Sequence, residues 1–211
     1  IRGLSQAERN ANDGISLVQT AEGAMDEISG MLIRMRELAV QSANGTTDSN
    51  QKGFLNNEFT QLRTEITRIA NATQFNGTDL LNAASTVTLQ VGIGTTAAND
   101  QINISLTNVS ATGLSVSANT INTATNALTA VDALDTAINS LSQQRGVLGA
   151  FQNRLSSTVR NLATTRENLS ASNSRIRDVD VASESVSMTK SQILMQAGTA
   201  VLAQANQLPS M

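Results

Sequence analysis

Seven large aliphatic residues recur at intervals of seven in the C-terminal half of the 211-residue chain. They are Leu134, Leu141, Leu148, Leu155, Leu162, Leu169 and Ile176. A strict seven-residue apolar repeat is typical of a helix that packs along its length against other helices. The column three residues earlier is only partly apolar, so the predicted seam is narrow. A helix from Val131 to Ile176 would be roughly 70 Å long, which favours a building block over an enzyme.

Two further helices are predicted in the N-terminal third, from about Leu4 to Ser42 and from about Asn50 to Asn71. Their apolar positions follow helical spacing. These positions are Val18, Met25, Leu32, Ala39, Ala21, Ile28, Met35 and Ser42 in the first helix, and Leu55, Phe59, Leu62, Ile66 and Ile69 in the second. Asn44-Gly45 stops the first helix at a dipeptide suited to positive φ. Asn76-Gly77 turns the chain again.

From Thr86 the apolar period changes to two, which predicts strands. Val87, Leu89, Val91 and Ile93 alternate with small or polar residues, and Ile102, Ile104 and Leu106 resume the pattern. We expect a β-hairpin with a loop longer than two residues. Leu114 and Val116 are predicted to add a short irregular strand. The hairpin region at about 86–118 is thus an insertion in a helical rod domain of residues 1–174.

Residues 175–211 are predicted to form a separate unit that contains an amphipathic helix from Val179 to Gln207. Its apolar stripe is Val179, Ala182, Val186, Ile193, Ala197 and Ala200, flanked by Met188, Met195 and Leu202. One lone helix has nothing to bury this stripe against, so we expect a missing partner. Residues 191–211 carry no charge, but their Gln and Asn amides are costly in hydrocarbon, so no membrane span is predicted. The predicted fold is therefore mainly α: an elongated antiparallel helical bundle with a small β-hairpin and this separate helix.

The composition excludes several classes of function. The chain has no Cys, His, Trp or Tyr, which removes disulfides, the commonest general base and the commonest metal ligand. A net charge of −3 without a basic run argues against a nucleic-acid partner. No signal peptide is recognised, and the chain opens at Ile1 inside a patterned run, so we expect a fragment whose natural N-terminus is missing.

No catalytic, cofactor-binding or metal-binding residue is predicted. Gly92-Ile93-Gly94 lacks the third glycine and the following helix of a dinucleotide loop, so we interpret it as a turn. The Asp132 and Asp135 carboxylates have no His beside them, and we interpret them as solvated groups near a helix N-terminus. Arg34 and Leu38 are helical neighbours on a face away from Met35 of the buried column. That face is either solvated or a contact site, since interface anchors favour Arg.

Motifs along most of the chain, outside roughly residues 83–125, resemble those of bacterial flagellins. They are IRGLSQA (1–7), NANDGIS (10–16), QTAEGA (19–24), RELAVQ (36–41), TQFNG (73–77), SRIRD (174–178), QIL (192–194) and AQANQ (203–207). The resemblance implies a secreted structural subunit that self-assembles into the bacterial flagellar filament for motility. Its implied partners are other flagellin subunits, an export chaperone, and hook-associated and cap proteins.

The resemblance also implies roles for individual residues. Val186, Ile193, Ala197, Ala200 and Leu202 would belong to an inner-tube helix that assembles in the filament or binds the chaperone. Arg34, Leu38 and Glu58 match positions that contact the animal flagellin-sensing Toll-like receptor, with Ile33 where Gln is usual. We interpret the Arg34–Leu38 face as a subunit contact that the receptor uses incidentally. A hook–filament junction protein, which shares the terminal motifs, and a carbohydrate-binding module on the hairpin remain alternatives.

Overall fold

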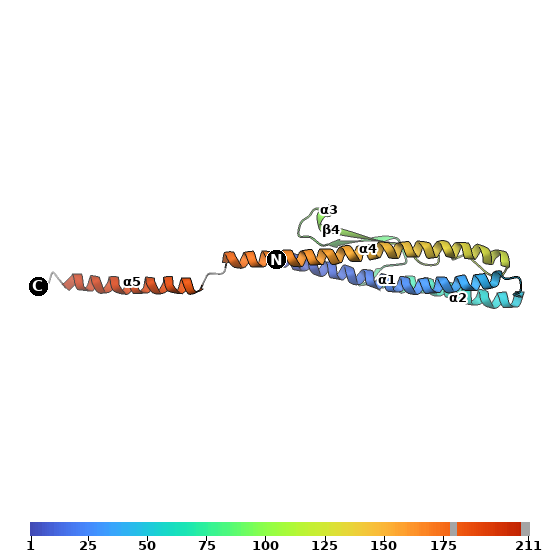
Figure 1. The fold of residues 1–211 in the computed structure, drawn as a ribbon, viewed down its shortest axis with the longest axis horizontal. Helices are drawn as coiled ribbons and strands as arrows, with labels where there is room; N and C mark the ends of the chain where they lie inside the picture. The colour runs from blue at the N-terminus through green and yellow to red at the C-terminus, as the bar shows by residue number, and fades with distance from the viewer. Residues whose placement is uncertain (178–180, 208–211) are drawn as a thin grey trace. The chain divides into compact units, whose positions relative to one another are not determined.

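A computed structural model describes residues 1–177 and 181–207 of the chain (Figure 1). The chain divides into two compact units, Ile1–Arg166 and Glu167–Met211. The elements are α1 (Arg2–Ala43), α2 (Ser49–Ala72), β1 (Gln74–Phe75), β2 (Thr78–Asp79), β3 (Ser85–Gln90), α3 (Ala97–Asp100), β4 (Gln101–Leu106), α4 (Ala124–Arg177) and α5 (Val181–Gln207). The mainly α fold with long helices and small strand pairs is confirmed. Helix α1, with 42 residues, is about 63 Å long.

The core of the first unit lies between α1, α2 and α4. Both apolar columns predicted for α1 are buried along their whole length. On α4 the leucine column is buried from Leu134 to Leu162, where Leu162 packs with Leu4 and Ala7 in the last layer of the seam. The prediction is wrong for the last two positions of the column, since Leu169 is 44% exposed and Ile176 is 84% exposed.

The second buried column of α4 consists of alanines and not of the larger residues expected from the sequence. Ala130 and Ala137 are buried, and Ala127 extends the leucine column one heptad before Leu134, whereas Val131 and Ile138 of the expected neighbouring column are only partly buried. The distance between packed helices depends on the side chains at their contact. At the N-terminal end of α4 this contact is made partly by small side chains.

The turn between α1 and α2 and the turn after α2 differ in backbone conformation. Asn44, the C-cap of α1, has φ −67°, so the positive φ expected there is wrong. Asp48 and Gln51 then form a capping box that starts α2. Positive φ is instead found at Asn76 (50°) and Gly77 (77°), which join the short antiparallel strands β1 and β2. Two such residues in a two-residue hairpin loop are what a right-handed strand twist favours. The turn expected here is thus part of a short hairpin, whose two strands are not indicated by the sequence pattern.

The predicted β-hairpin is confirmed as the antiparallel pair β3–β4, in which Val87 lies opposite Ile104 and Leu89 opposite Ile102. Ile93 lies beyond β3, in a loop that also contains α3, and is exposed. The strand expected around Leu114 and Val116 is wrong. Both residues are buried within hydrogen-bonded turns, in which their backbone N–H groups donate to carbonyls four and five residues earlier.

The β-hairpin is held on α1 by one close approach and one hydrogen bond. A Cβ on Gly14 would lie 2.2 Å from Cδ1 of Leu89, so the glycine lets the Leu89 side chain lie directly against the helix. The Asn10 amide donates to the carbonyl oxygen of Gln90 at 2.9 Å. These contacts fix the hairpin along the first unit.

The second unit contains the end of α4 and the single helix α5, whose predicted start at Val179 lies outside the described residues. The structure places the division between units at residues 166 and 167, inside α4. The predicted functional boundary at residues 174 and 175 therefore also falls within a continuous helix. As a boundary between the rod and the inner-tube segment, it stays a prediction.

Candidate assembly surfaces

A charged cluster, which we define as Arg34, Glu37 and Glu58, joins α1 to α2 on the surface of the first unit. The Arg34 Nε and Nη2 atoms lie 2.9 and 2.8 Å from Oε1 of Glu58. Its Nη1 lies 3.0 Å from Oε2 of Glu37, one turn along α1. The hydrogen bond to Glu58, followed by that to Glu37, raises the pKa of Arg34 above its ordinary value. About half of the Arg34 side chain is exposed, so the cluster presents fixed charges of both signs to a partner.

Leu38 does not share this exposure. It is 1% exposed and belongs to the core of the first unit, so the prediction of an apolar side chain outside the seam is wrong. Because Arg34 pairs with Glu58 of α2, this side of α1 faces α2, and Leu38 lies one turn further along the same side. Arg34 keeps its charge in water while its long stem crosses apolar surface. The predicted trio is thus divided into two surface residues and one core residue.

A second ion pair connects α1 to α4. The Arg36 guanidinium donates two hydrogen bonds to Asp135, from Nε to Oδ1 at 2.6 Å and from Nη2 to Oδ2 at 3.2 Å. The hydrogen bond from Arg36 lowers the pKa of Asp135 below its ordinary value. A carboxylate held by two guanidinium bonds is a poor proton acceptor. The pairing thus gives Asp135 a structural role.

Acid should weaken the Arg36–Asp135 connection. Because the folded pKa of Asp135 is lowered, its stabilisation is fully present above the ordinary value of 3.8 and is lost as pH falls through the folded value. We therefore expect Asp135→Asn to lower the free energy of unfolding slightly at neutral pH, and the deficit to shrink in acid. Urea unfolding of both proteins at neutral and acidic pH measures this. A deficit that is the same at both pH values would contradict the assignment.

Acidic residues of α1 also pair with two arginines of α4. The Arg145 Nη1 atom lies 3.0 Å from Oδ1 of Asp26, and Arg166 bonds to Glu8. With Arg36–Asp135 they make three ion pairs between the two helices. Residues later in α1 pair with residues earlier in α4, as an antiparallel arrangement requires. In the sequence, both arginines stand in the partly apolar column that lies three residues before the leucine column. In the fold they set the register of the two helices.

Several large apolar side chains of the first unit remain uncovered, and the sequence analysis had not singled them out as a group. Within the helices of this unit they are Ile33 and Val40 on α1, Phe54 on α2, and Leu128 and Val147 on α4, and Ile1 and Ile93 are exposed outside the helices. Ile33 and Val40 are seven residues apart and share one face of α1. The sequence could have indicated this face, because both residues are apolar and neither belongs to the columns predicted to be buried. We define the exposed α1 face as Ile33, Val40 and the charged cluster beside them.

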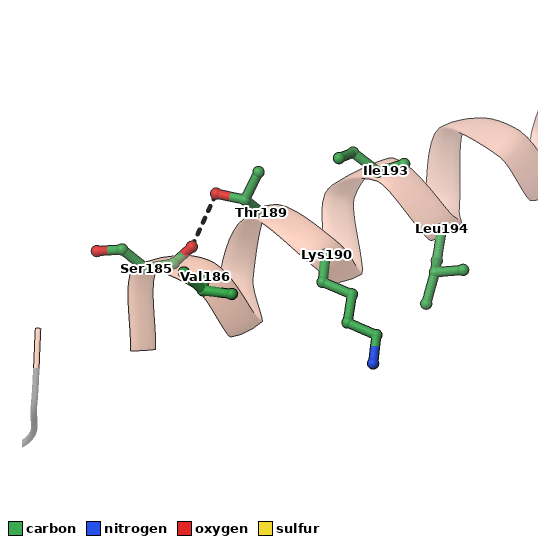
Figure 2. Close-up of a pocket in the computed structure, with 6 residues that line it drawn as sticks. All are labelled: Ser185, Val186, Thr189, Lys190, Ile193 and Leu194. Atoms are coloured by element: carbon green, nitrogen blue, oxygen red, sulfur yellow. Dashed lines mark hydrogen bonds between the residues drawn. The ribbon is translucent and has the colours of Figure 1, made fainter. Parts of the chain in front are cut away.

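Helix α5 exposes the five residues predicted to act in assembly or chaperone binding, namely Val186, Ile193, Ala197, Ala200 and Leu202. Other exposed apolar residues extend beyond the predicted stripe, at Val181, Met188, Leu194, Met195 and Val201. Figure 2 shows Val186, Ile193 and Leu194 projecting from α5 together with Thr189 and Lys190. The six lining residues all belong to α5, so among the described residues of the second unit this surface is an open helix face and not an enclosed cavity. A helix with apolar side chains on several sides requires cover on several sides.

Two family matches and a set of close relatives identify the chain. Residues 1–86 match the bacterial flagellin N-terminal helical region, and residues 131–211 match the bacterial flagellin C-terminal helical region. A flagellin of Halalkalibacterium halodurans is 51% identical over 99% of the chain and 77% of its own length. The chain belongs to the bacterial flagellin family. The flagellar filament 33 kDa core protein of Treponema phagedenis is 43% identical over 98% of the chain and 77% of its own length.

Solved structures agree with this family assignment. Bacillus cereus flagellin superposes with a TM-score of 0.66 at 30% identity, over 78% of this chain and 94% of that one. A putative flagellar hook-associated protein from Vibrio parahaemolyticus has the same TM-score at 15% identity, over 81% of this chain and 89% of that one. At 15% identity the likeness shows only a shared fold. The fold alone therefore does not separate flagellins from hook-associated proteins, and the family assignment rests on the two family matches and the flagellin relatives.

Flagellin is a family of structural proteins, so this chain is a structural subunit of the flagellar filament and not an enzyme. Flagellins assemble with copies of themselves into a homopolymer that is exposed outside the cell as part of the flagellum. Among residues 1–177 and 181–207, no group of three or more His, Cys, Asp or Glu side chains could hold a metal ion. None of the helices described here is long and apolar enough to cross a membrane.

Proposed function

We propose that this flagellin assembles through one surface on each of its two units: the exposed α1 face of the first unit and the apolar surface of α5 in the second. The observation that carries the proposal is the exposure of eight large apolar side chains on α5. Burying them would contribute on the order of 10–20 kcal/mol as an upper bound. That is enough to make α5 the main source of assembly free energy.

Filament growth requires contacts between two different surfaces of successive subunits, because such contacts propagate without closing. We propose that the charged cluster belongs to the second of these surfaces, on the first unit. It lies on rigid helices, carries both signs of charge, and adjoins the uncovered side chains of Ile33 and Val40. Complementary charges fix the register of a contact more than its strength. On this proposal α5 supplies affinity and the exposed α1 face supplies register.

An uncovered α5 also bears on events before assembly. A subunit whose apolar helix is exposed tends to associate with other apolar surfaces, so it requires cover until it is incorporated. We propose that an export chaperone covers α5 until the subunit is secreted. We also propose that hook-associated and cap proteins contact the exposed α1 face and the apolar surface of α5 at the filament ends. A chaperone that binds Ile193→Asp as well as it binds the unchanged chain would contradict the first of these assignments.

The charged cluster is also the part of the predicted receptor site that a receptor can reach. We propose that an animal flagellin-sensing Toll-like receptor recognises Arg34 and Glu58. Leu38, being buried, acts only by supporting the helix pair. A reporter-cell assay of Arg34→Glu tests this proposal. Receptor activation equal to that of the unchanged chain would contradict it.

Charge reversal at Arg34 should impair filament assembly. Arg34→Glu places three carboxylates together at positions 34, 37 and 58, which removes the bridge to α2 and inverts the surface charge. We expect the critical concentration for polymerisation to rise about tenfold, which corresponds to the free energy of one interfacial charge contact. Sedimentation after salting-out and negative-stain electron microscopy measure the effect.

Two matched variants separate recognition from folding. Arg68→Glu reverses a charge beside Glu65, elsewhere on α2, and should leave assembly unchanged. The double swap Arg34→Glu with Glu58→Arg keeps an ion pair between α1 and α2 but inverts its direction. Recovery of normal assembly by the swap would show that only the bridge matters and would refute a contact through this cluster. Normal assembly of Arg34→Glu itself would also refute it.

A further inference from the structure

Asparagine followed by glycine occurs twice in the chain, at residues 44–45 and 76–77, in two different backbone settings. In such a pair the backbone nitrogen of the glycine can attack the side-chain amide carbon of the asparagine. Glycine favours the attack because it has no Cβ and its backbone is permissive. Whether the attack occurs depends on how freely the backbone of each pair moves.

The first pair lies in the open turn between α1 and α2. Both residues are exposed, and apart from Gly45 and its two chain neighbours no atom lies within 4 Å of the position that a Cβ on Gly45 would take. The Asn44 carbonyl accepts from the Thr47 N–H at 3.2 Å, and its Oδ1 accepts from the Thr46 N–H at 3.2 Å. Among the hydrogen bonds of the described residues, the Gly45 N–H takes part in none. The attacking nitrogen is therefore available.

The second pair is restrained on both sides. Asn76 and Gly77 hold positive φ values in the loop between β1 and β2, whose residues pair directly around the turn. The Gln74 amide donates to Oδ1 of Asp79 at 2.6 Å, across the same hairpin. Just beyond it, the Leu80 N–H donates to the Thr73 carbonyl at 3.1 Å. Bringing the Gly77 nitrogen to the Asn76 amide requires opening these pairings.

We propose that Asn44 is a site of spontaneous deamidation in this flagellin, and that Asn76 is protected from it. The Gly45 nitrogen gives up its proton to hydroxide and bonds to Cγ of Asn44. The Nδ2 group takes a proton from water, which restores the hydroxide, and the bond from Cγ to Nδ2 breaks so that ammonia leaves. Water then opens the cyclic imide at either carbonyl and produces aspartate or isoaspartate at position 44. One water molecule is consumed, one ammonia is released, and no electrons are exchanged.

The conversion changes the connection between α1 and α2. Asn44 is the C-cap of α1, and a new carboxylate there lies at the negative end of the helix dipole. Isoaspartate also adds a methylene to the backbone of the turn. The product should unfold about 1–4 °C lower than the unmodified chain. In a polymer, every converted subunit would carry this extra negative charge beside the α1–α2 turn.

Incubation of the full chain in mildly alkaline buffer tests the proposal. Peptide mapping by mass spectrometry, with enzymatic labelling of isoaspartate, follows both sites in one sample. The Asn44 peptide should convert about fivefold to tenfold faster than the Asn76 peptide, the factor expected if the net cost of opening these pairings to water equals the net contribution of one hydrogen bond. Equal rates, or faster conversion at Asn76, would overturn the proposal.

Gly45→Ala is the matched control. The position is open and has no positive φ, so alanine is accommodated without strain. The added methyl group crowds the attacking nitrogen, and conversion of Asn44 should slow several-fold while that of Asn76 stays the same. Conversion of Asn44 at the unchanged rate in this variant would show that Gly45 is not the attacking residue, and would refute the mechanism.

Discussion

Leu38→Ala should lower the free energy of unfolding of this flagellin by about 2–5 kcal/mol, the range measured for large-to-small substitutions at buried leucines. The side chain is almost fully buried in the core between the helices of the first unit. Its removal leaves a cavity in this core, one turn along α1 from the Arg34–Glu58 bridge. Urea unfolding followed by circular dichroism measures the loss.

Ile33→Ala is the matched control, because it removes a large aliphatic side chain five residues earlier on the same helix. About half of Ile33 is exposed, so the free energy of unfolding should change by roughly 0.5 kcal/mol or less. Equal losses for the two variants would contradict the burial of Leu38. If the prediction holds, a defect of Leu38 variants in assembly or receptor recognition reports a weakened helix pair, whereas a defect of Ile33→Ala reports a lost contact.

The helices of the first unit could be predicted because their apolar residues follow helical spacing, and on α1 every residue of the two predicted columns is buried. The prediction missed the burial of Leu38 because a helix that packs against two neighbours buries two adjoining faces. A heptad pattern describes only one seam. On α4 the wrong residues were predicted to form the second buried column. Val131 and Ile138 are more hydrophobic than the alanines and were therefore favoured, although they are only partly buried.

The candidate site could be predicted only in part. The resemblance to flagellins selected Arg34 and Glu58, and the structure places them in contact although they are 24 positions apart. The partner of Arg36 is 99 positions away, and no spacing within one sequence indicates such a pair. The exposed face of Ile33 and Val40 was also missed, since single apolar residues on a surface are common and carry no pattern. Long-range pairing and exposure both depend on the assembled fold.

Ile193→Asp should abolish filament assembly while leaving the isolated subunit folded. Ile193 is exposed on α5, so an aspartate there remains in water before assembly. On assembly the variant forfeits the burial of an isoleucine side chain and must desolvate a carboxylate in a segment whose residues 191–207 carry no charge. We expect the critical concentration to rise by at least about a hundredfold. Salting-out followed by electron microscopy and sedimentation measures it.

Ile193→Leu distinguishes a lost apolar contact from a general sensitivity of this position. A volume-conserving exchange keeps the burial free energy nearly constant, so this variant should form filaments close to the unchanged critical concentration. Circular dichroism and thermal unfolding of both variants should match those of the unchanged subunit, because no described side chain packs over Ile193. Filaments from Ile193→Asp at the ordinary concentration would show that this side of α5 stays in water within the polymer. The exposed α1 face would then have to supply most of the assembly free energy, and Arg34→Glu would become the more damaging substitution.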